Sequence, residues 1–369
     1  MNEDQFYQLA LYYCPGVGDI AIKHLIGYFG NAQEVFKSNK SKLKNVPGIG
    51  YKIIESITSK NTLAKAEKEL KNLEQLNIDL LFFTDRNYPT RLKEIPDAPP
   101  LLFFKGNCDL NALKTIAIVG TRRATHYGKD VVQNIINQLR KHQVLIISGL
   151  AYGIDICAHR AAVEVNLPTL GVLGSGIDVV YPAVHKKTAL EMLDKGGLIT
   201  EQPSGAQPDA HNFPARNRII AGLADAIIIV EAAARGGALI TAEIANSYNK
   251  DVFAIPGSIF SEYSRGCNHL IRNHKANILT AVEDLEYLMN WNPDTQNIIK
   301  PDDEFVNLNE REKSVVKILR LNEREMLIDD LSWKSQIPIN QLASVLLNLE
   351  FQGLIKALPG RKFRLANLL

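Results

Sequence analysis

The sequence predicts an α/β protein built around a Rossmann-like, doubly wound and mostly parallel sheet. Short and almost continuous apolar runs alternate with longer amphipathic stretches, a pattern typical of parallel strands buried on both faces and of the helices that connect them. Glycine and other small residues crowd the end of nearly every predicted strand. A ligand backbone can therefore approach closely along one edge of the sheet.

Residues 1–75 are predicted to be helical. Two turns of the form Gly-hydrophobic-Gly, at 16–18 and 48–50, precede apolar-periodic stretches at 20–29 and 51–57. Such turns are typical of a helix-hairpin-helix or SAM-like domain, where the backbone N–H groups of the turn can face a nucleic-acid phosphate. They equally serve as helix caps in a small packing domain, and the residues leave both interpretations open.

Residues 76–113 are Pro-rich and strand-like and predict an ordered extension that leads into a core at 114–290. The first core strand, 116–119, ends at Gly120, Thr121 and Arg122 and precedes a helix at 128–143. Ligands in open α/β sheets bind beyond the carboxyl ends of the strands, so this junction predicts a phosphate site. The further strands are predicted at 144–148, 169–173, 198–200, 226–230 and 252–255, with helices at 154–165 and 238–248.

A polar stretch at 291–305 predicts a linker, and residues 306–369 predict a winged helix-turn-helix. Helices are expected at 311–319, 326–331 and 339–351, followed by a hairpin with strands at 354–358 and 362–365. The third helix contains no Lys or Arg between residues 338 and 353. Since phosphate contacts supply most nucleic-acid affinity, this domain is as well suited to protein interaction as to DNA reading.

The composition is that of a soluble globular protein of two or three domains, with 369 residues, 46% hydrophobic and 22% charged. The net charge of +2 means that any nucleic-acid site must be a local basic cluster. Neither a signal peptide nor a long apolar run is present, so we expect a cytoplasmic protein without a membrane anchor. The four cysteines lack metal-ligand or redox spacing, which suits a reducing compartment.

Basic and aromatic residues follow several of the core strands. If the sheet is wound as predicted, most of them lie near one edge of it. Cations along a backbone, interleaved with rings on which bases stack, are what single-stranded nucleic acid needs. The basic residues are Arg122, Arg123, His126, Lys129, Lys186, Lys187, Arg216, Arg218 and Arg235, and the aromatic residues are Tyr181 and Phe213.

Enzyme motifs are weaker. Asp155 and His159 lie four residues apart on a predicted helix, but no third metal ligand accompanies them. Glu201 and Glu231 stand at strand ends without an obvious acid–base partner, and holding Arg216 or Arg218 is a better role for them. Nucleophile-elbow, P-loop and dinucleotide-binding glycine patterns are absent from the sequence. We therefore expect no catalytic residues, no metal and no cofactor.

An ordered set of motifs spans residues 80–290. The motifs are Val-Gly-Thr-Arg at 119–122, Ser-Gly-Leu-Ala-Tyr-Gly-Ile-Asp at 148–155 with His159, Tyr-Pro at 181–182, Phe-Pro-Ala-Arg-Asn-Arg-Ile-Ile-Ala-Gly at 213–222, Thr-Ala at 241–242 and Ile-Pro-Gly at 255–257. Taken together, these motifs resemble the DNA-processing protein A (DprA/Smf) family. The helical N-terminal region and the winged-helix tail also resemble accessory domains that many members carry.

The resemblance implies a Rossmann-like core that binds single-stranded DNA, forms a homodimer through that core, and helps load the RecA recombinase on incoming DNA during natural transformation. At the matching positions, Gly120, Thr121 and Arg122 would hold a phosphate and Phe213 would stack against a base. The other residues implied in DNA binding are Ser148, Gly149, Gly153, Lys186, Arg216, Asn217, Arg218, Arg235 and Gly237. One departure is the acidic-to-neutral segment 209–212, where members often carry a basic residue; Lys187 and Arg235 are candidates to compensate.

Two other hypotheses stay open at this point. The segment 235–243 is a near miss to the Pro-Gly-Gly-x-Gly-Thr-x-x-Glu motif of nucleotide phosphoribohydrolases, which share the same broad fold group. It lacks the proline and the third glycine, and its spacing to Thr241 is one residue longer, which displaces Glu243. A regulator that binds double-stranded DNA through the tail is disfavoured by the absence of Lys and Arg from the third helix.

Overall fold

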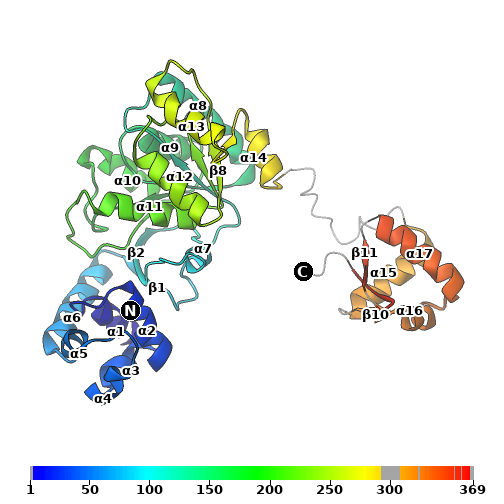
Figure 1. Cartoon of the computed structure of the whole chain (residues 1–369), viewed down its shortest axis with the longest axis horizontal. Coiled ribbons are helices and arrows are strands. Elements are labelled where there is room, and N and C mark those ends of the chain that lie inside the picture. Colours follow the sequence, from blue (N-terminus) through cyan, green and yellow to red (C-terminus); the bar gives the residue numbers. More distant parts are fainter. Residues whose placement is uncertain (1–2, 292–307, 323–324, 353, 359, 366–369) are drawn as a thin grey trace. The chain divides into compact units, whose positions relative to one another are not determined.

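The computed structural model describes residues 3–291, 308–322, 325–352, 354–358 and 360–365. The chain divides into two compact units, Met1–Met289 and Asn290–Leu369 (Figure 1). The predicted linker at 291–305 lies, apart from Trp291, outside the described residues. In the part of the chain that is described, no helix is both long and apolar enough to cross a membrane. The finer division of the first unit at residues 75 and 113 stays a prediction.

A nine-stranded sheet forms the centre of the first unit, in the order β1-β2-β6-β5-β4-β3-β7-β8-β9. All neighbours from β6 to β9 in this order pair in parallel, whereas β1 and β2 add to one edge antiparallel. The predicted Rossmann-like, mostly parallel sheet is thus confirmed. The strands are β1 (Asp79–Phe82), β2 (Leu101–Gly106), β3 (Thr115–Val119), β4 (Leu145–Ser148), β5 (Thr169–Val172), β6 (Gly197–Thr200), β7 (Ala226–Ile229), β8 (Asp251–Ala254) and β9 (Asn277–Ile278).

Helices cover both faces of this sheet, which is why β3, β4 and β7 are buried along their whole length. On one face α8, α9 and α10 contact one another in sequence, and α14 packs against α8. On the other face α11, α12 and α13 share a core with the opposite side chains of the strands. The bounds are α8 (His126–Leu139), α9 (Ile154–Glu164), α10 (Lys186–Met192), α11 (Asn212–Leu223), α12 (Gly237–Ser247), α13 (Arg265–Arg272) and α14 (Val282–Leu288), with the 3-10 helix η2 (Ala183–His185) before α10.

The strand order reverses direction at β3. The chain runs from β3 through β4 and β5 to β6 on one side, and then from β7 to β9 on the other. The loops that follow β3 and β7 therefore diverge to opposite faces and leave a crevice between them. Such a switch point is where open α/β sheets bind ligands.

The first residues form six helices that pack against the antiparallel edge of the sheet. Their apolar side chains share one core with Leu80, Phe82, Leu101 and Phe103 of β1 and β2. The two Gly-hydrophobic-Gly turns lie directly before α2 and α5, as predicted. The helices are α1 (Glu3–Tyr12), α2 (Asp19–Phe29), α3 (Ala32–Lys37), α4 (Lys40–Lys44), α5 (Tyr51–Ile57) and α6 (Lys60–Gln75).

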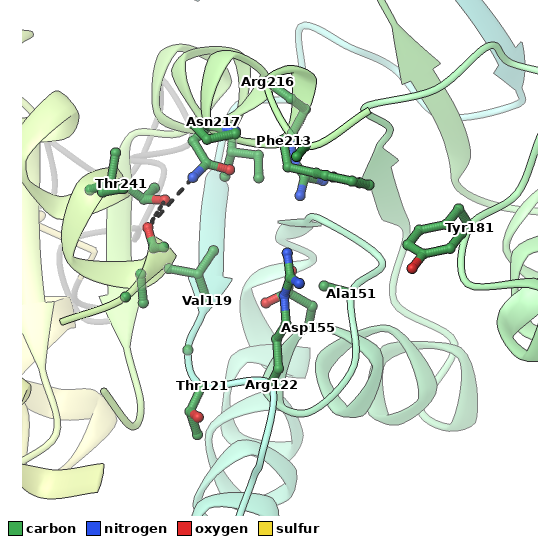
Figure 2. A pocket seen from close by; sticks show the side chains of 18 of the residues that line it. Val119, Thr121, Arg122, Ala151, Asp155, Tyr181, Phe213, Arg216, Asn217 and Thr241 are labelled. Carbon is green, nitrogen blue, oxygen red and sulfur yellow. Dashed lines mark hydrogen bonds between the residues drawn. The ribbon is translucent and has the colours of Figure 1, made fainter. Parts of the chain in front are cut away.

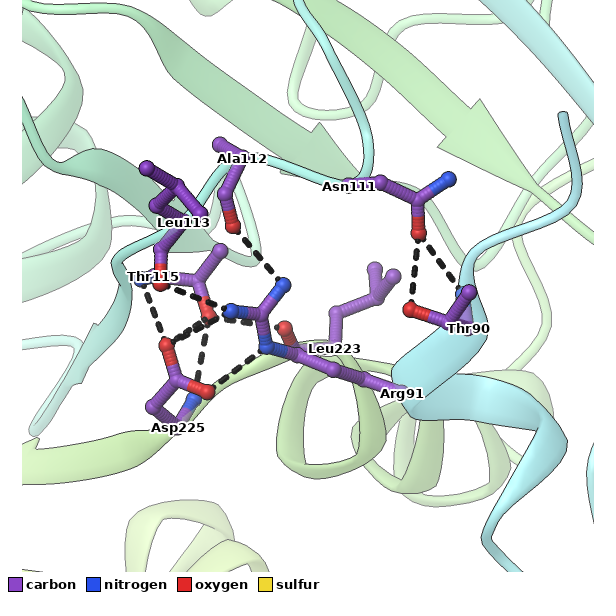
Figure 3. Close-up of polar contacts among 8 residues, drawn as sticks. All are labelled: Thr90, Arg91, Asn111, Ala112, Leu113, Thr115, Leu223 and Asp225. Carbon is purple, nitrogen blue, oxygen red and sulfur yellow. Dashed lines mark hydrogen bonds and ion pairs between the residues drawn. The ribbon is translucent and has the colours of Figure 1, made fainter. Parts of the chain in front are cut away.

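An ion pair joins the segment between β1 and β2 to the core (Figure 3). Arg91, on α7 (Thr90–Lys93), donates from Nε to Asp225 Oδ1 at 2.6 Å and from Nη2 to Asp225 Oδ2 at 2.9 Å. Asp225 stands immediately before β7 and also accepts from the backbone N of Thr115 at 2.8 Å, at the start of β3. A single carboxylate thus ties the amino ends of two central strands to α7.

The second unit has its own core and a three-stranded sheet in the order β10-β12-β11. The predicted winged helix is confirmed, with one correction. Met326 and Leu327 form a short strand that pairs with β12, so the second helix begins only at Ile328. The apolar periodicity there fits either element, and backbone pairing with the hairpin decides between them. The elements are α15 (Glu310–Asn322), β10 (Met326–Leu327), α16 (Ile328–Ser335), α17 (Ile339–Phe351), β11 (Ile355–Leu358) and β12 (Lys362–Leu365).

We expect Arg91→Ala and Asp225→Ala each to lower the free energy of unfolding by about 1–3 kcal/mol, because each leaves a charged partner without its hydrogen bonds. A double-variant cycle in urea should give a coupling energy of about 0.5–3 kcal/mol. The exposed Glu67–Lys71 pair, at 2.8 Å, is the control and should show a clearly smaller coupling energy, because solvent screens it. Equal coupling in the two pairs would contradict the anchoring role.

Candidate nucleic-acid interface

A cavity of about 1130 Å³ opens at the carboxyl edge of the sheet, at the switch point between β3 and β7 (Figure 2). Its walls come from the segments that follow β3, β4, β5 and β7 and from the first turns of α11 and α12. These segments are far apart in the sequence, and the parallel sheet brings them together.

The loop after β3 forms one wall and is held rigidly. Thr121 donates its N–H to Glu231 O at 2.7 Å and accepts from the N–H of Ile154 at 3.1 Å. Gly153 has a φ of +79°, and a Cβ there would lie 2.1 Å from Thr121 O, so only glycine permits this approach. These backbone contacts hold the loop in place and leave the Arg122 side chain exposed near Asp155 (Figure 2).

Glu231 supports the same loop from its other end. Its carboxylate accepts from the backbone N of Thr125 at 2.9 Å and from the Thr125 hydroxyl at 2.6 Å, at the start of α8. The expectation that Glu231 holds an arginine is therefore wrong, whereas Glu201 does pair with Arg218, at 2.5 Å. Both glutamates act on the fold, and neither lines the cavity.

Arg216 reaches the cavity wall from α11 but is only 5% exposed. Its Nη1 donates to Gly149 O at 2.7 Å and also to Val172 O, so it joins the ends of β4 and β5 to α11. A Cβ at Gly149 would lie 2.5 Å from this nitrogen, which explains the glycine. Burial lowers the pKa of Arg216 to about 10, against the attraction of Asp155, so the guanidinium is cationic at neutral pH.

Asp155 is the carboxylate that balances these cations. It is buried, and its Oδ2 accepts from the backbone N of Gly149 at 3.2 Å. Burial raises the pKa of Asp155, and Arg216 and Arg122 oppose that rise. Asp155 and His159 have the sequence spacing of a helix contact or a metal-binding face. His159 instead meets the Thr169 hydroxyl through Nδ1 at 2.7 Å, and burial lowers its pKa to about 3.

Phe213 lies in the first turn of α11, on the wall opposite the β3 loop (Figure 2). The Arg122 guanidinium carbon is 5.7 Å from the centre of its ring, within reach of a cation–π contact. The Tyr181 ring lies 5.7 Å away at an interplanar angle of 39°. The cavity therefore combines an exposed guanidinium with two aromatic rings.

The far end of the cavity is formed by Arg235, Gly236 and the start of α12. Asn217 Nδ2 and the Thr241 hydroxyl both donate to Gly237 O, at 3.5 Å and 3.1 Å (Figure 2). No atom comes within 4 Å of a Cβ built on Gly236 or Gly237, so this backbone is open to the cavity.

The structure gathers eight of the thirteen expected binding residues around the cavity. They are Gly120, Thr121, Arg122, Phe213, Arg216, Asn217, Arg235 and Gly237. The other five do not line it, for reasons that differ. Ser148, Gly149 and Gly153 lie beneath it, with the Ser148 hydroxyl donating to Ile118 O at 2.6 Å. Lys186 is exposed at the start of α10.

Arg218 is turned toward the N-terminal helices. Its Nη2 pairs with Glu201 at 2.5 Å and with Asp19 of α2 at 3.5 Å. The spacing of Arg216, Asn217 and Arg218 on α11 already separates their directions by about 100° per residue. Arg216 and Arg218 are close in the sequence, but of the two only Arg216 lies on the side of α11 that faces the cavity.

Comparison with known proteins identifies the family. Residues 79–290 match the model of DNA recombination-mediator protein A, and residues 309–361 match the DprA winged helix domain. Protein Smf of Synechocystis sp. is 32% identical over 98% of this chain and 99% of its own length. DNA processing protein DprA of Streptococcus pneumoniae is 44% identical over 54% of this chain and 71% of its own.

Solved structures agree. The X-ray structure of DprA from Streptococcus pneumoniae matches with a TM-score of 0.66 and 34% identity, covering 77% of this chain and 98% of that one. DNA processing protein A from Helicobacter pylori, whose structure describes its single-stranded DNA binding mode, matches with a TM-score of 0.53 and 28% identity over 58% of this chain and 96% of that one. The sequence motifs, the fold and these relatives together place this chain in the DNA recombination-mediator protein A (DprA/Smf) family.

Proposed function

We propose that the cavity binds the sugar–phosphate backbone and the bases of single-stranded DNA. The observation that carries this proposal is the position of Arg122, exposed above a clamped backbone loop and 5.7 Å from the Phe213 ring. A guanidinium grips a phosphate through two parallel N–H groups, and an aromatic ring beside it stacks a base. Phosphate and base of one nucleotide are thereby bound together.

The arrangement favours a single strand over a duplex. Stacking on Phe213 or Tyr181 needs a base whose face is free, and in a duplex the neighbouring base pairs cover both faces. The cavity lies at a sheet edge and presents no helix or ribbon that fits a groove. Contacts to phosphates and to the faces of bases are possible with any sequence, so we expect little sequence selectivity.

Family membership supports the wider role. The Helicobacter pylori relative is described as binding single-stranded DNA, and the Streptococcus pneumoniae relative carries the name DNA processing protein DprA. We infer a DNA-binding role in recombination without catalysis, in which the protein protects incoming single strands and loads RecA recombinase during natural transformation. Self-association through the Rossmann-like core is part of the same proposal.

The alternative, a nucleotide phosphoribohydrolase, requires a carboxylate near a ribose in the cavity. Glu243, the candidate from the near-miss motif, forms an ion pair with Lys275 at 2.7 Å and is not among the residues that line the cavity. Asp155 does line it, but its carboxylate accepts the Gly149 N–H. Free base released from nucleoside monophosphates, and lost in Glu243→Gln, would favour the hydrolase.

We expect tighter binding to a single-stranded oligonucleotide than to the matched duplex. Affinity for the single strand should fall by about 0.7 log units per tenfold increase in salt for each phosphate neutralised. Fluorescence anisotropy across a salt series measures both quantities. Equal or tighter duplex binding, or an affinity independent of salt, would argue against the proposal.

Arg122→Ala should weaken single-strand binding by about 1.5–3 kcal/mol and flatten the salt dependence, because a charge-assisted phosphate contact is lost. Arg122→Lys is the matched control: it keeps the charge and the salt slope but loses bidentate geometry.

Phe213→Ala should weaken single-strand binding by about 1–3 kcal/mol at every salt concentration and leave the salt slope unchanged, because stacking depends little on charge. A thermal melt of each variant checks the fold; a large drop in the Phe213→Ala midpoint with intact affinity would make Phe213 a packing residue.

A further inference from the structure

The rim of the cavity continues onto an exposed surface outside it. Ala151 and Ala183 line the cavity, and the residues that follow them, Tyr152 and Val184, are 49% and 64% exposed. Both pairs lie at the carboxyl edge of the sheet, one after β4 and the other in η2 after β5. A strand that leaves the cavity on this side meets Tyr152 and Val184 next.

The Tyr152 ring is supported from behind. It packs edge-to-face on His185, with ring centres 5.1 Å apart and an interplanar angle of 70°. His185 is itself buried and meets Leu150 O through Nδ1 at 2.8 Å. An aromatic ring that is fixed on one side and half-exposed on the other costs little entropy when a base stacks on it.

Cations stand on the two helices that begin next to this ring, Arg160 on α9 and Lys186 on α10. Lys186 follows His185 directly and is exposed, and Arg160 donates from Nε to the Thr188 hydroxyl at 3.4 Å, which brings α9 beside α10. Lys129 and Arg160 both act on the Cys157 thiol of α9, where their charges oppose the rise in its pKa that burial causes. We call the surface formed by Tyr152, Arg160, Val184 and Lys186 the α9–α10 shelf. Lys187 is left out because Glu191 lies 3.8 Å from its ammonium.

We propose that the α9–α10 shelf is a second binding site for the same DNA strand, which takes the nucleotides next to those in the cavity. This inference rests on the proposed function. Tyr152 stacks one base, and Lys186 and Arg160 neutralise the adjoining phosphates, as in other single-strand tracks that combine rings with cations. The shelf thus extends the bound length of DNA in one direction from Arg122.

The test compares oligothymidylates of two lengths, about four nucleotides to fill the cavity and about sixteen to reach beyond it. Tyr152→Ala should weaken binding of the long oligonucleotide about five-fold or more, and Tyr152→Phe should restore it. The short oligonucleotide should bind both variants as it binds the unaltered protein. Tyr287→Ala on α14, which removes a ring that is 78% exposed, is the control and should change neither affinity.

A long oligonucleotide whose flanking nucleotides are abasic separates the contribution of charge from that of stacking, because it keeps the phosphates and lacks the bases. Lys186→Ala should weaken its binding and lower the salt slope by about 0.7, whereas Tyr152→Ala should have no effect on it. Lys195→Ala is the matched control, because Lys195 precedes β6 at the amino edge of the sheet and donates to Asn166. Extending the short oligonucleotide at its 5′ or 3′ end separately identifies which end enters the shelf.

The outcomes distinguish the two proposals. If Arg122→Ala weakens both lengths while Tyr152→Ala and Lys186→Ala weaken neither, the cavity binds DNA and the shelf does not, and this inference is overturned. If Tyr152→Ala weakens both lengths equally, Tyr152 belongs to the cavity site and the shelf is again rejected. If the unaltered protein binds neither oligonucleotide, the proposed function fails and takes the inference with it.

Discussion

The buried guanidinium of Arg216 holds the carboxyl edge of the sheet together. Through Nη1 it reaches the ends of β4 and β5, and it belongs to the same helix turn as Phe213. The position of the aromatic wall relative to the strand ends is therefore set by one side chain. Removing a cation from such a site leaves carbonyl groups unsatisfied, which is costly in a buried environment.

A buried cation needs a counter-charge, and Asp155 supplies it. The same carboxylate lies beneath Arg122, so the two arginines share one anion although they differ in exposure. Arg216 is enclosed and acts on the fold, whereas Arg122 is free to meet a phosphate. Because the buried Arg216 supports the fold and the exposed Arg122 is left for the ligand, the binding site is preorganised while its contact surface stays open.

The location of the cavity follows from the winding of the sheet. Because the order reverses at β3, the loops after β3 and β7 open away from each other, and helices on the two faces cannot close the gap. At the other end, Asp225 ties β7, β3 and α7 together. The amino edge is thus cross-linked by an ion pair, while the carboxyl edge carries the cavity.

The N-terminal helices and the antiparallel strands act as one body with this sheet. Leu25 and Ile54 of the helices share one hydrophobic core with Phe82 of β1 and Phe103 of β2. Arg218 belongs to this contact through Glu201 and Asp19, and its charge is thereby directed away from the cavity. A cation one residue from Asn217 in sequence contributes to packing between elements and not to the cavity wall.

The sequence by itself determined the elements and their chemistry. Apolar runs between glycine-rich turns predicted the core strands from β3 to β8 to within a residue, and the Gly-Thr-Arg junction after β3 located the exposed arginine. Local rules suffice there, because burial on both faces and backbone geometry at a turn depend on neighbours in the chain. The two-residue strand β9 at the edge was not predicted. The short strand at Met326 was missed, since its pairing partner lies in a hairpin more than thirty residues later.

Only the tertiary structure decided which cations share the cavity. Arg122 and Arg216 are both basic residues near strand ends, yet one is exposed and the other is enclosed by Gly149, Val172 and Asp155. Lys186 and Arg218 carry the same charge and do not line the cavity. The direction of a side chain depends on the elements packed around it, and those come from distant parts of the sequence. Charge can be read from the residues, but its exposure is set by the packing of the sheet and its helices.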